Sequence, residues 1–167
     1  VTFNKEFFEF LETNDLNDAK ILQEAIKRAV QTKASVVAKD EKEHGIRAAL
    51  NYGHTFGHVI ENETQYKGFL HGEAVAIGMV MANELAIKMN LMNQKEALRV
   101  KNLLERYNLP TDYRINDVKA FYEAFFLDKK SLDSSITFIL PLGIGDVVIT
   151  DKVDIGAVMC VLNKFGS

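Results

Sequence analysis

The sequence predicts a mostly α-helical, multi-helical domain with a small β-hairpin near its C-terminus. Both of its two prolines, Pro110 and Pro141, lie in the second half of the chain, so the first half can form long helices. Apolar residues make up 47% of the 167 residues, which is enough for one hydrophobic core. Two β-branched runs, residues 136–140 and 146–150, flank a Pro-Leu-Gly-Ile-Gly turn and predict the hairpin. We expect one compact domain over residues 1–167.

Two helices are predicted at the start of the chain. Asn4 is suited to cap a short helix and Asn17 or Asp18 a much longer one, because these side chains accept hydrogen bonds from the first helical amides. The apolar row of the longer helix, expected to face inward, consists of Leu22, Ile26, Ala29 and Val36. Lys33 continues this row, so its ammonium group is expected on the inward side. Lysine is seldom buried unpaired, so Lys33 either lines an active site or extends its stem to the helix edge.

Five further helices are predicted along the rest of the chain. Residues 55–62 have helical spacing. Residues 72–89 are apolar almost all the way round, which is typical of a helix enclosed by other protein, and we expect this helix at the centre. Residues 94–107 and 118–126 are amphipathic packing elements, and a final helix is expected over residues 153–163.

Composition excludes several classes of partner. The net charge is only −3, with acidic and basic residues interspersed, so no basic field is available for nucleic acid or an anionic membrane. The longest apolar run, residues 74–82, is far shorter than the roughly 20 residues of a membrane span, and no targeting signal is expected. The single Cys160 cannot form an internal disulfide, is expected to be buried, and fits a reducing cytoplasm.

Three of the four histidines lie between residues 54 and 71. A stripe spaced three, four and three residues apart, expected on one helix face, consists of Asn51, His54, His58 and Glu61. Each of these polar groups would need a partner if buried, so something polar should lie against that face. Two histidines four residues apart can share one metal ion, or one can ligate while the other acts as acid, base or phosphate contact. Solvated or structurally hydrogen-bonded histidines are the alternative.

Further charged or polar groups flank this stripe. His71 opens the buried helix, at an N-terminus that favours oxygen anions, although a lone histidine there is more often a cap. The segment 40–47 is charge-dense and would ordinarily be a solvated loop. Lys129 and Lys130 form a basic point before the hairpin, and such pairs are usually surface charge.

Taken together, these segments resemble the 3-dehydroquinate synthase family. The matching strings, in the family's order, are Lys33-Ala-x-Val-Val, Asp40-Glu-x-Glu-x-Gly-x-Arg47, Leu50-Asn-x-Gly-His-Thr-Phe-Gly-His58, His71-Gly-Glu-x-Val75 and Asp128-Lys-Lys130. The resemblance covers most of the chain. The long histidine string, followed at this separation by the His-Gly-Glu string, is far more specific than an isolated histidine pair.

The resemblance implies an activity. Enzymes of this family convert 3-deoxy-D-arabino-heptulosonate 7-phosphate, an acidic sugar phosphate, to 3-dehydroquinate and phosphate in the shikimate pathway. They are phosphate-eliminating lyases that use catalytic NAD and a divalent metal, usually zinc, with cobalt as another possibility. NAD takes a hydride from the substrate, phosphate leaves, the hydride returns, and ring opening with an aldol closure completes the carbocycle.

The resemblance also assigns roles to individual residues. His54 and His71 match two of the family's three metal ligands, a pair of neutral imidazoles suited to zinc. Asn51 and His58 match residues that contact the substrate phosphate and its neighbourhood. The family also places cationic residues at the site, and these match other parts of the chain.

Those cationic residues line the site in the family. Lys33 matches one of them, and Arg47 matches the group that faces the substrate carboxylate, where a guanidinium can donate two parallel hydrogen bonds. Either Lys129 or Lys130 matches an anion-binding lysine. Glu43 is a weaker candidate for a carboxylate that orients a ligand.

By the same resemblance, parts of the family enzyme precede this chain. The third metal ligand is a glutamate in a Glu-x-x-Lys segment immediately before Val1, and an N-terminal α/β domain holds NAD. Residues 143–145 join two predicted strands without opening a helix, so they indicate a turn and not a dinucleotide loop. We therefore expect a C-terminal half that is inactive alone, does not bind NAD, and has the missing domain as its partner. The family is commonly dimeric, so a homodimer is expected.

Two other interpretations remain open. A related sugar-phosphate cyclase, such as one that uses sedoheptulose 7-phosphate, would keep the metal and NAD chemistry but lack the substrate carboxylate, which Arg47 favours. A helical binding or oligomerisation module with structural histidines would have no catalytic role.

Overall fold

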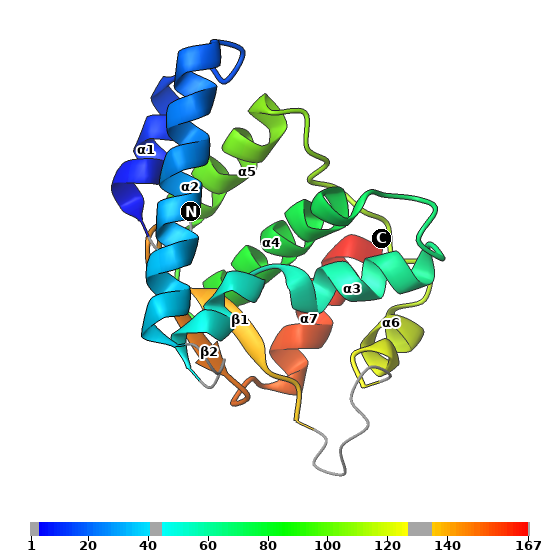
Figure 1. Ribbon diagram of the computed structural model, residues 1–167. Coiled ribbons are helices and arrows are strands. Elements are labelled where there is room, and N and C mark those ends of the chain that lie inside the picture. The colour runs from blue at the N-terminus through cyan, green and yellow to red at the C-terminus, as the bar shows by residue number, and fades with distance from the viewer. Residues whose placement is uncertain (1–3, 41–44, 127–134, 167) are drawn as a thin grey trace.

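The computed structural model describes residues 4–40, 45–126 and 135–166. In these ranges the chain forms seven α-helices, one 3-10 helix and one antiparallel two-stranded hairpin (Figure 1). The predicted mostly α-helical fold with a C-terminal hairpin is therefore confirmed. Lys129, Lys130 and Glu43 lie outside the described residues, so their predicted roles stay predictions.

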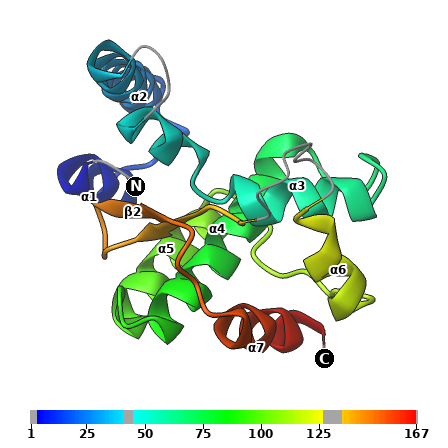
Figure 2. The same ribbon diagram turned by 90° about the horizontal axis from the view of Figure 1, so that it is seen from below.

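The first two helices begin where the capping residues predicted. Helix α1, Lys5–Thr13, follows Asn4, whose Oδ1 accepts a hydrogen bond of 2.9 Å from the amide of Phe7. Helix α2, Ala19–Lys39, follows Asp18, which accepts from the amide of Lys20 at 2.8 Å. The two helices lie side by side at one edge of the molecule, and α2 stands away from the main body (Figure 2).

The predicted inward face of α2 is confirmed only at Val36 and is wrong for the rest of its apolar row. Leu22 and Ile26 are 42% and 54% exposed, Lys33 is exposed as well, and the buried residues of this helix are Ala25 and Val36. The apolar spacing identified residues that share a face, but it did not say which face meets the protein. The helix has few neighbours, α1 and the 3-10 helix η1, Ile46–Asn51, and their positions select a different side.

Helix α4, His71–Lys88, is the central helix, as predicted. Its buried side chains point in all directions, because α3, α5, α7 and the first strand all pack against it. The fully buried residues include Ile77, Met81 and Leu85. Helix α3, His54–Glu63, lies across it and shares the most extensive helix contact in the described chain (Figure 1).

The remaining elements complete the core around α4. They are α5, Gln94–Arg106, α6, Val118–Ala124, β1, Phe138–Pro141, β2, Val147–Thr150, and α7, Ile155–Gly166. Strand β1 is buried throughout and pairs with β2 in a register that sets Phe138 opposite Thr150. Cys160 on α7 is exposed, so its predicted burial is wrong. None of the helices described here has both the length and the hydropathy that a membrane span requires.

Candidate metal centre

The histidine motif spans two helical segments. Asn51 ends the 3-10 helix η1, whereas His54, His58 and Glu61 belong to α3. Between them Gly53 has a φ of +85°, in the left-handed region that favours glycine. The predicted single helical stripe is therefore wrong for Asn51, although Asn51 still lines the same pocket as the two histidines.

Glycines bring α3 unusually close to α4. A Cβ atom on Gly78 of α4 would lie 2.0 Å from the carbonyl oxygen of Gly53, and a Cβ atom on Gly57 would lie 3.2 Å from the carbonyl oxygen of Ala74. At Gly78 only a hydrogen allows the backbones to meet, and at Gly57 a Cβ atom would be closer than an ordinary contact. The glycines of the Gly-His-Thr-Phe-Gly-His string thus hold its histidines beside the start of α4, where His71 lies.

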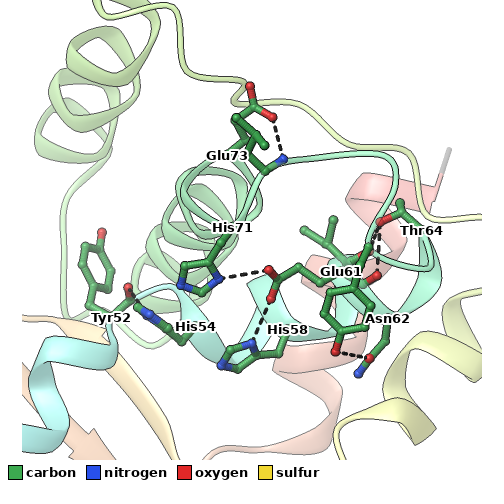
Figure 3. A network of polar contacts seen from close by, with 11 residues as sticks. Tyr52, His54, His58, Glu61, Asn62, Thr64, His71 and Glu73 are labelled. Carbon is green, nitrogen blue, oxygen red and sulfur yellow. Dashed lines mark hydrogen bonds and ion pairs between the residues drawn. The ribbon is translucent and has the colours of Figure 1, made fainter.

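Three imidazole rings converge at this junction. The ring centroids of His54 and His58 are 5.5 Å apart, those of His54 and His71 are 5.2 Å apart, and those of His58 and His71 are 5.9 Å apart. Figure 3 shows the three rings gathered around one space, with two from α3 and one from α4. The fold thus brings the three histidines together, although they belong to two different helices.

Glu61 lies between two of these rings. Its Oε2 is 3.0 Å from Nδ1 of His58, and its Oε1 is 3.0 Å from Nδ1 of His71. Burial alone would raise the pKa of the Glu61 carboxyl, but the hydrogen bonds from His58 and His71 outweigh it and lower the pKa. The sequence placed Glu61 in the polar stripe without a role. Glu61 lies three residues after His58, and on a helix this spacing indicates that the two side chains can form a hydrogen bond.

His54 is held by the backbone at its own turn. Its Nδ1 lies 3.4 Å from the carbonyl oxygen of Tyr52. Burial lowers the pKa of His54, the Tyr52 carbonyl partly opposes this, and the neighbouring His58 and His71 lower it further. The lowered pKa favours the neutral imidazole of His54, which is the form that binds metals.

Tyr52 anchors this turn to α4. Its hydroxyl donates a hydrogen bond to Oδ1 of Asn83, and both residues are buried. Burial raises the pKa of the Tyr52 phenol. The carbonyl that contacts His54 is thus fixed through the core.

A pocket of about 360 Å³ opens beside the cluster. Asn51, His54 and His58 line one side, and Phe125 and Ile136 line another. The volume lies in the range of about 300–1,000 Å³ that is usual for small-molecule sites. His71 reaches the cluster from α4, outside the lining of this pocket.

The other predicted site residues are not all at the cluster. Arg47 is half-buried in η1, where its backbone amide donates to Oδ2 of Asp40 at 3.0 Å. Lys33 lies exposed on α2. The structure therefore brings together Asn51, His54, His58 and His71, whereas Lys33 lies on a separate element, α2.

The donor groups suit a divalent metal. His58, Glu61 and His71 each offer a ligand atom, and these atoms lie within 4.8 Å of one another. Imidazole nitrogen with carboxylate oxygen is a donor set that zinc and cobalt accept. His54, whose lowered pKa favours the neutral ring, adds a further imidazole in the same space. The residues present therefore fit a metal ion.

Comparison with known proteins identifies relatives for this chain. The 3-dehydroquinate synthase C-terminal family model matches residues 1–131. The chain is 81% identical over 166 residues to the 3-dehydroquinate synthase of Sulfurimonas denitrificans, covering 99% of the chain and 48% of that protein. It is 59% identical over 165 residues to that of Nitratiruptor sp., covering 99% and 47%. The chain spans about half the length of the curated relatives that it matches.

Two solved structures share this fold. One is 2-epi-5-epi-valiolone synthase from Streptomyces hygroscopicus with NAD+ and Zn2+ bound, with a TM-score of 0.81 and 26% identity over 98% of this chain and 47% of that one. The other is 2-deoxy-scyllo-inosose synthase in complex with carbaglucose-6-phosphate, NAD+ and Co2+. Its TM-score is 0.75 at 29% identity, over 87% of this chain and 42% of that one.

Proposed function

The chain belongs to the 3-dehydroquinate synthase family, and from that membership we propose that it is the metal- and substrate-binding half of such a synthase. The complete enzyme would convert 3-deoxy-D-arabino-heptulosonate 7-phosphate to 3-dehydroquinate and phosphate. The observation that carries the proposal is the convergence of His54, His58 and His71, whose ring centroids lie between 5.2 and 5.9 Å apart.

His54 and His71 are the proposed metal ligands of this chain. The Nδ1 atoms of both rings already have oxygen neighbours, the Tyr52 carbonyl and the Glu61 carboxylate, which leaves the Nε2 atoms for an ion. The lowered pKa of His54 keeps its lone pair available at neutral pH. When bound, zinc or cobalt would polarise the hydroxyls at the carbon that is oxidised. A glutamate from the preceding part of the family enzyme is the proposed third ligand.

The remaining residues are proposed to hold the substrate's anionic groups. Asn51 and His58 line the pocket and would contact the phosphate and its surroundings. Arg47 would bind the carboxylate through its fork of donors. Lys33 and one of Lys129 and Lys130 would add positive charge. Positioning and charge stabilisation of this kind are the main tasks, because the departing phosphate can itself accept the proton.

NAD is proposed to bind the half of the enzyme that this chain does not represent. The two solved neighbours contain NAD+, and the chain covers 47% and 42% of them. In the described part of the chain, Gly143 and Gly145 have positive φ and join β1 to β2, so this turn opens no helix that could receive a pyrophosphate. The chain alone would therefore not turn over substrate. Its homodimeric state and cytoplasmic location stay predictions.

The relatives favour the carboxylate-bearing substrate over other sugar phosphates. The proteins that are 81% and 59% identical are named 3-dehydroquinate synthases. The two solved neighbours, which are named for other cyclic products, are only 26% and 29% identical. A different cyclase therefore has less support than the synthase.

The experiment joins this chain to the remaining half of the Sulfurimonas denitrificans synthase and measures phosphate release with NAD and zinc. We expect turnover of 3-deoxy-D-arabino-heptulosonate 7-phosphate and little of sedoheptulose 7-phosphate. His54→Ala and His71→Ala should each lower kcat/KM by more than about 100-fold, beyond the cost of losing an outer partner of a metal ligand. Lys88→Ala, at the far exposed end of α4, is the matched control.

Two results would reject the proposal. A clear preference for sedoheptulose 7-phosphate would reject the substrate. Calorimetry measures the zinc affinity of the wild type, His54→Ala and His71→Ala. Equal affinities would reject the metal site and support a binding module with structural histidines.

A further inference from the structure

Glu61 is proposed above neither as a metal ligand nor as a substrate contact, although it lies between His58 and His71 in the histidine cluster. Its side chain is only 8% exposed, whereas those of His58 and His71 are 48% and 57% exposed. A carboxylate that is buried beside exposed imidazoles needs specific partners to offset its desolvation. Both of its oxygens have one.

The two oxygens of Glu61 serve different rings on different helices. Oε2 contacts Nδ1 of His58, one turn earlier on α3, and Oε1 contacts Nδ1 of His71, at the start of α4, each at 3.0 Å. Figure 3 shows the carboxylate bridging the two rings. Glu61 contacts Nδ1 in both histidines, so it constrains the hydrogen on that nitrogen in the same way in each ring.

That consequence concerns where the protons lie. An ionised carboxylate can only accept hydrogen bonds, so each Nδ1 must carry the hydrogen that it donates to Glu61. In a neutral imidazole the other nitrogen, Nε2, then holds the lone pair. A single carboxylate thus selects one tautomer in two rings.

We propose that Glu61 is a positioning residue that holds His58 and His71 in the Nδ1-H tautomer and presents both Nε2 lone pairs to the space shared with His54. One lone pair would face the metal, and that of His58 would accept a hydrogen bond from a hydroxyl group of the substrate. This second part rests on the proposed function, whereas the choice of tautomer does not. Histidine ligands in metal sites commonly donate their second ring N–H to such a carboxylate.

The first test reads the tautomers directly. In the 167-residue chain without metal, nitrogen-15 NMR of the imidazoles should show Nδ1 protonated and Nε2 bare in both His58 and His71, at a pH where the rings are neutral. In Glu61→Gln the amide has one accepting oxygen and one donating nitrogen, so only one ring can keep its bond. We expect the other ring to change to the Nε2-H tautomer or to a mixture.

Glu73→Gln is the matched control. It removes the same charge close to His71, but the amide oxygen can still accept the hydrogen bond that the Leu70 amide donates to Glu73 at 2.8 Å. We expect both tautomers unchanged in this variant, and circular dichroism should show that both variants keep the helical content. Nε2-H tautomers in the wild type, or unchanged tautomers in Glu61→Gln, would overturn the proposal.

The second test measures zinc affinity by competition with a chelating dye. Loss of an orienting partner lowers metal affinity by about 10- to 100-fold, so we expect this for Glu61→Gln and no change for Glu73→Gln. A loss in Glu61→Gln as large as that in His71→Ala would mean that Glu61 is itself a ligand, and would overturn the positioning role. If the wild type has the expected tautomers and no zinc affinity, the metal proposal fails and the tautomer proposal stands.

Discussion

The two longest described helices, α2 and α4, relate to the protein core in opposite ways. Helix α2 has 21 residues and only two buried ones, and its apolar side chains Leu22, Ile26 and Val30 are exposed. Helix α4 has 18 residues, and ten of them are buried. A helix that is apolar all round has only one stable environment, so its burial was predictable. A helix with an apolar row can turn that row either way when its neighbours are few.

This difference also separates the site residues. His71 begins α4, and glycine contacts hold α3 with His54 and His58 against it. Lys33 belongs to α2, so its distance from the cluster depends on a helix with few contacts to the core. The three histidines are thus held by well-packed helices, whereas the position of Lys33 depends on α2, which has few contacts.

The largest expected effect comes from truncating the core face of α4. Ile77 is fully buried, so Ile77→Ala should lower the free energy of unfolding by about 2–5 kcal/mol through lost burial and the cavity left behind. Ile26→Ala on α2, at a side chain that is 54% exposed, should cost less than about 0.5 kcal/mol. Urea denaturation of both variants measures the contrast. Similar losses would mean that Ile26 is buried in solution.

A smaller effect is expected where α3 meets α4. The new methyl group in Gly78→Ala would lie 2.0 Å from the Gly53 carbonyl oxygen, so the helices must separate at a cost of about 1–3 kcal/mol. Zinc affinity should fall too, because His54 and His71 move apart. Gly72→Ala is the control, since a Cβ atom there meets no described atom within 4 Å. Unchanged stability and zinc affinity in Gly78→Ala would show that close helix contact does not shape the site.

The smallest expected effect is a pH dependence at the Tyr52 anchor. The pKa of Tyr52 is raised in the folded chain, so its stabilising contribution is complete below the unfolded pKa of about 10 and is lost as the pH rises above that value. The pKa of Tyr113 is also raised, by burial and by Glu63, and acts in the same direction. Denaturation at increasing pH should show falling stability, and Tyr52→Phe should reduce the slope. An equal slope in Tyr52→Phe would remove Tyr52 from the explanation.

Sequence reasoning was most accurate where the signal is local. The cap at Asn4, the buried central helix and the hairpin each depend on residues adjacent in sequence, and all three are present. It failed for the inward face of α2, for the burial of Cys160 and for the position of Asn51, which the left-handed Gly53 separates from α3. The first two depend on which distant segment approaches, and the third depends on the left-handed turn at Gly53.

The sequence by itself determined the helical fold, the family and the three histidines from which a site would be built. Only the tertiary structure decided that Glu61 bridges His58 and His71, because that contact joins two helices across a turn. It exists since α3 and α4 meet at Gly53 and Gly78, where a missing side chain lets backbone touch backbone. Hydrogen bonds between residues close in sequence determine where helices and turns form. The packing of distant segments determines which polar side chains come into contact.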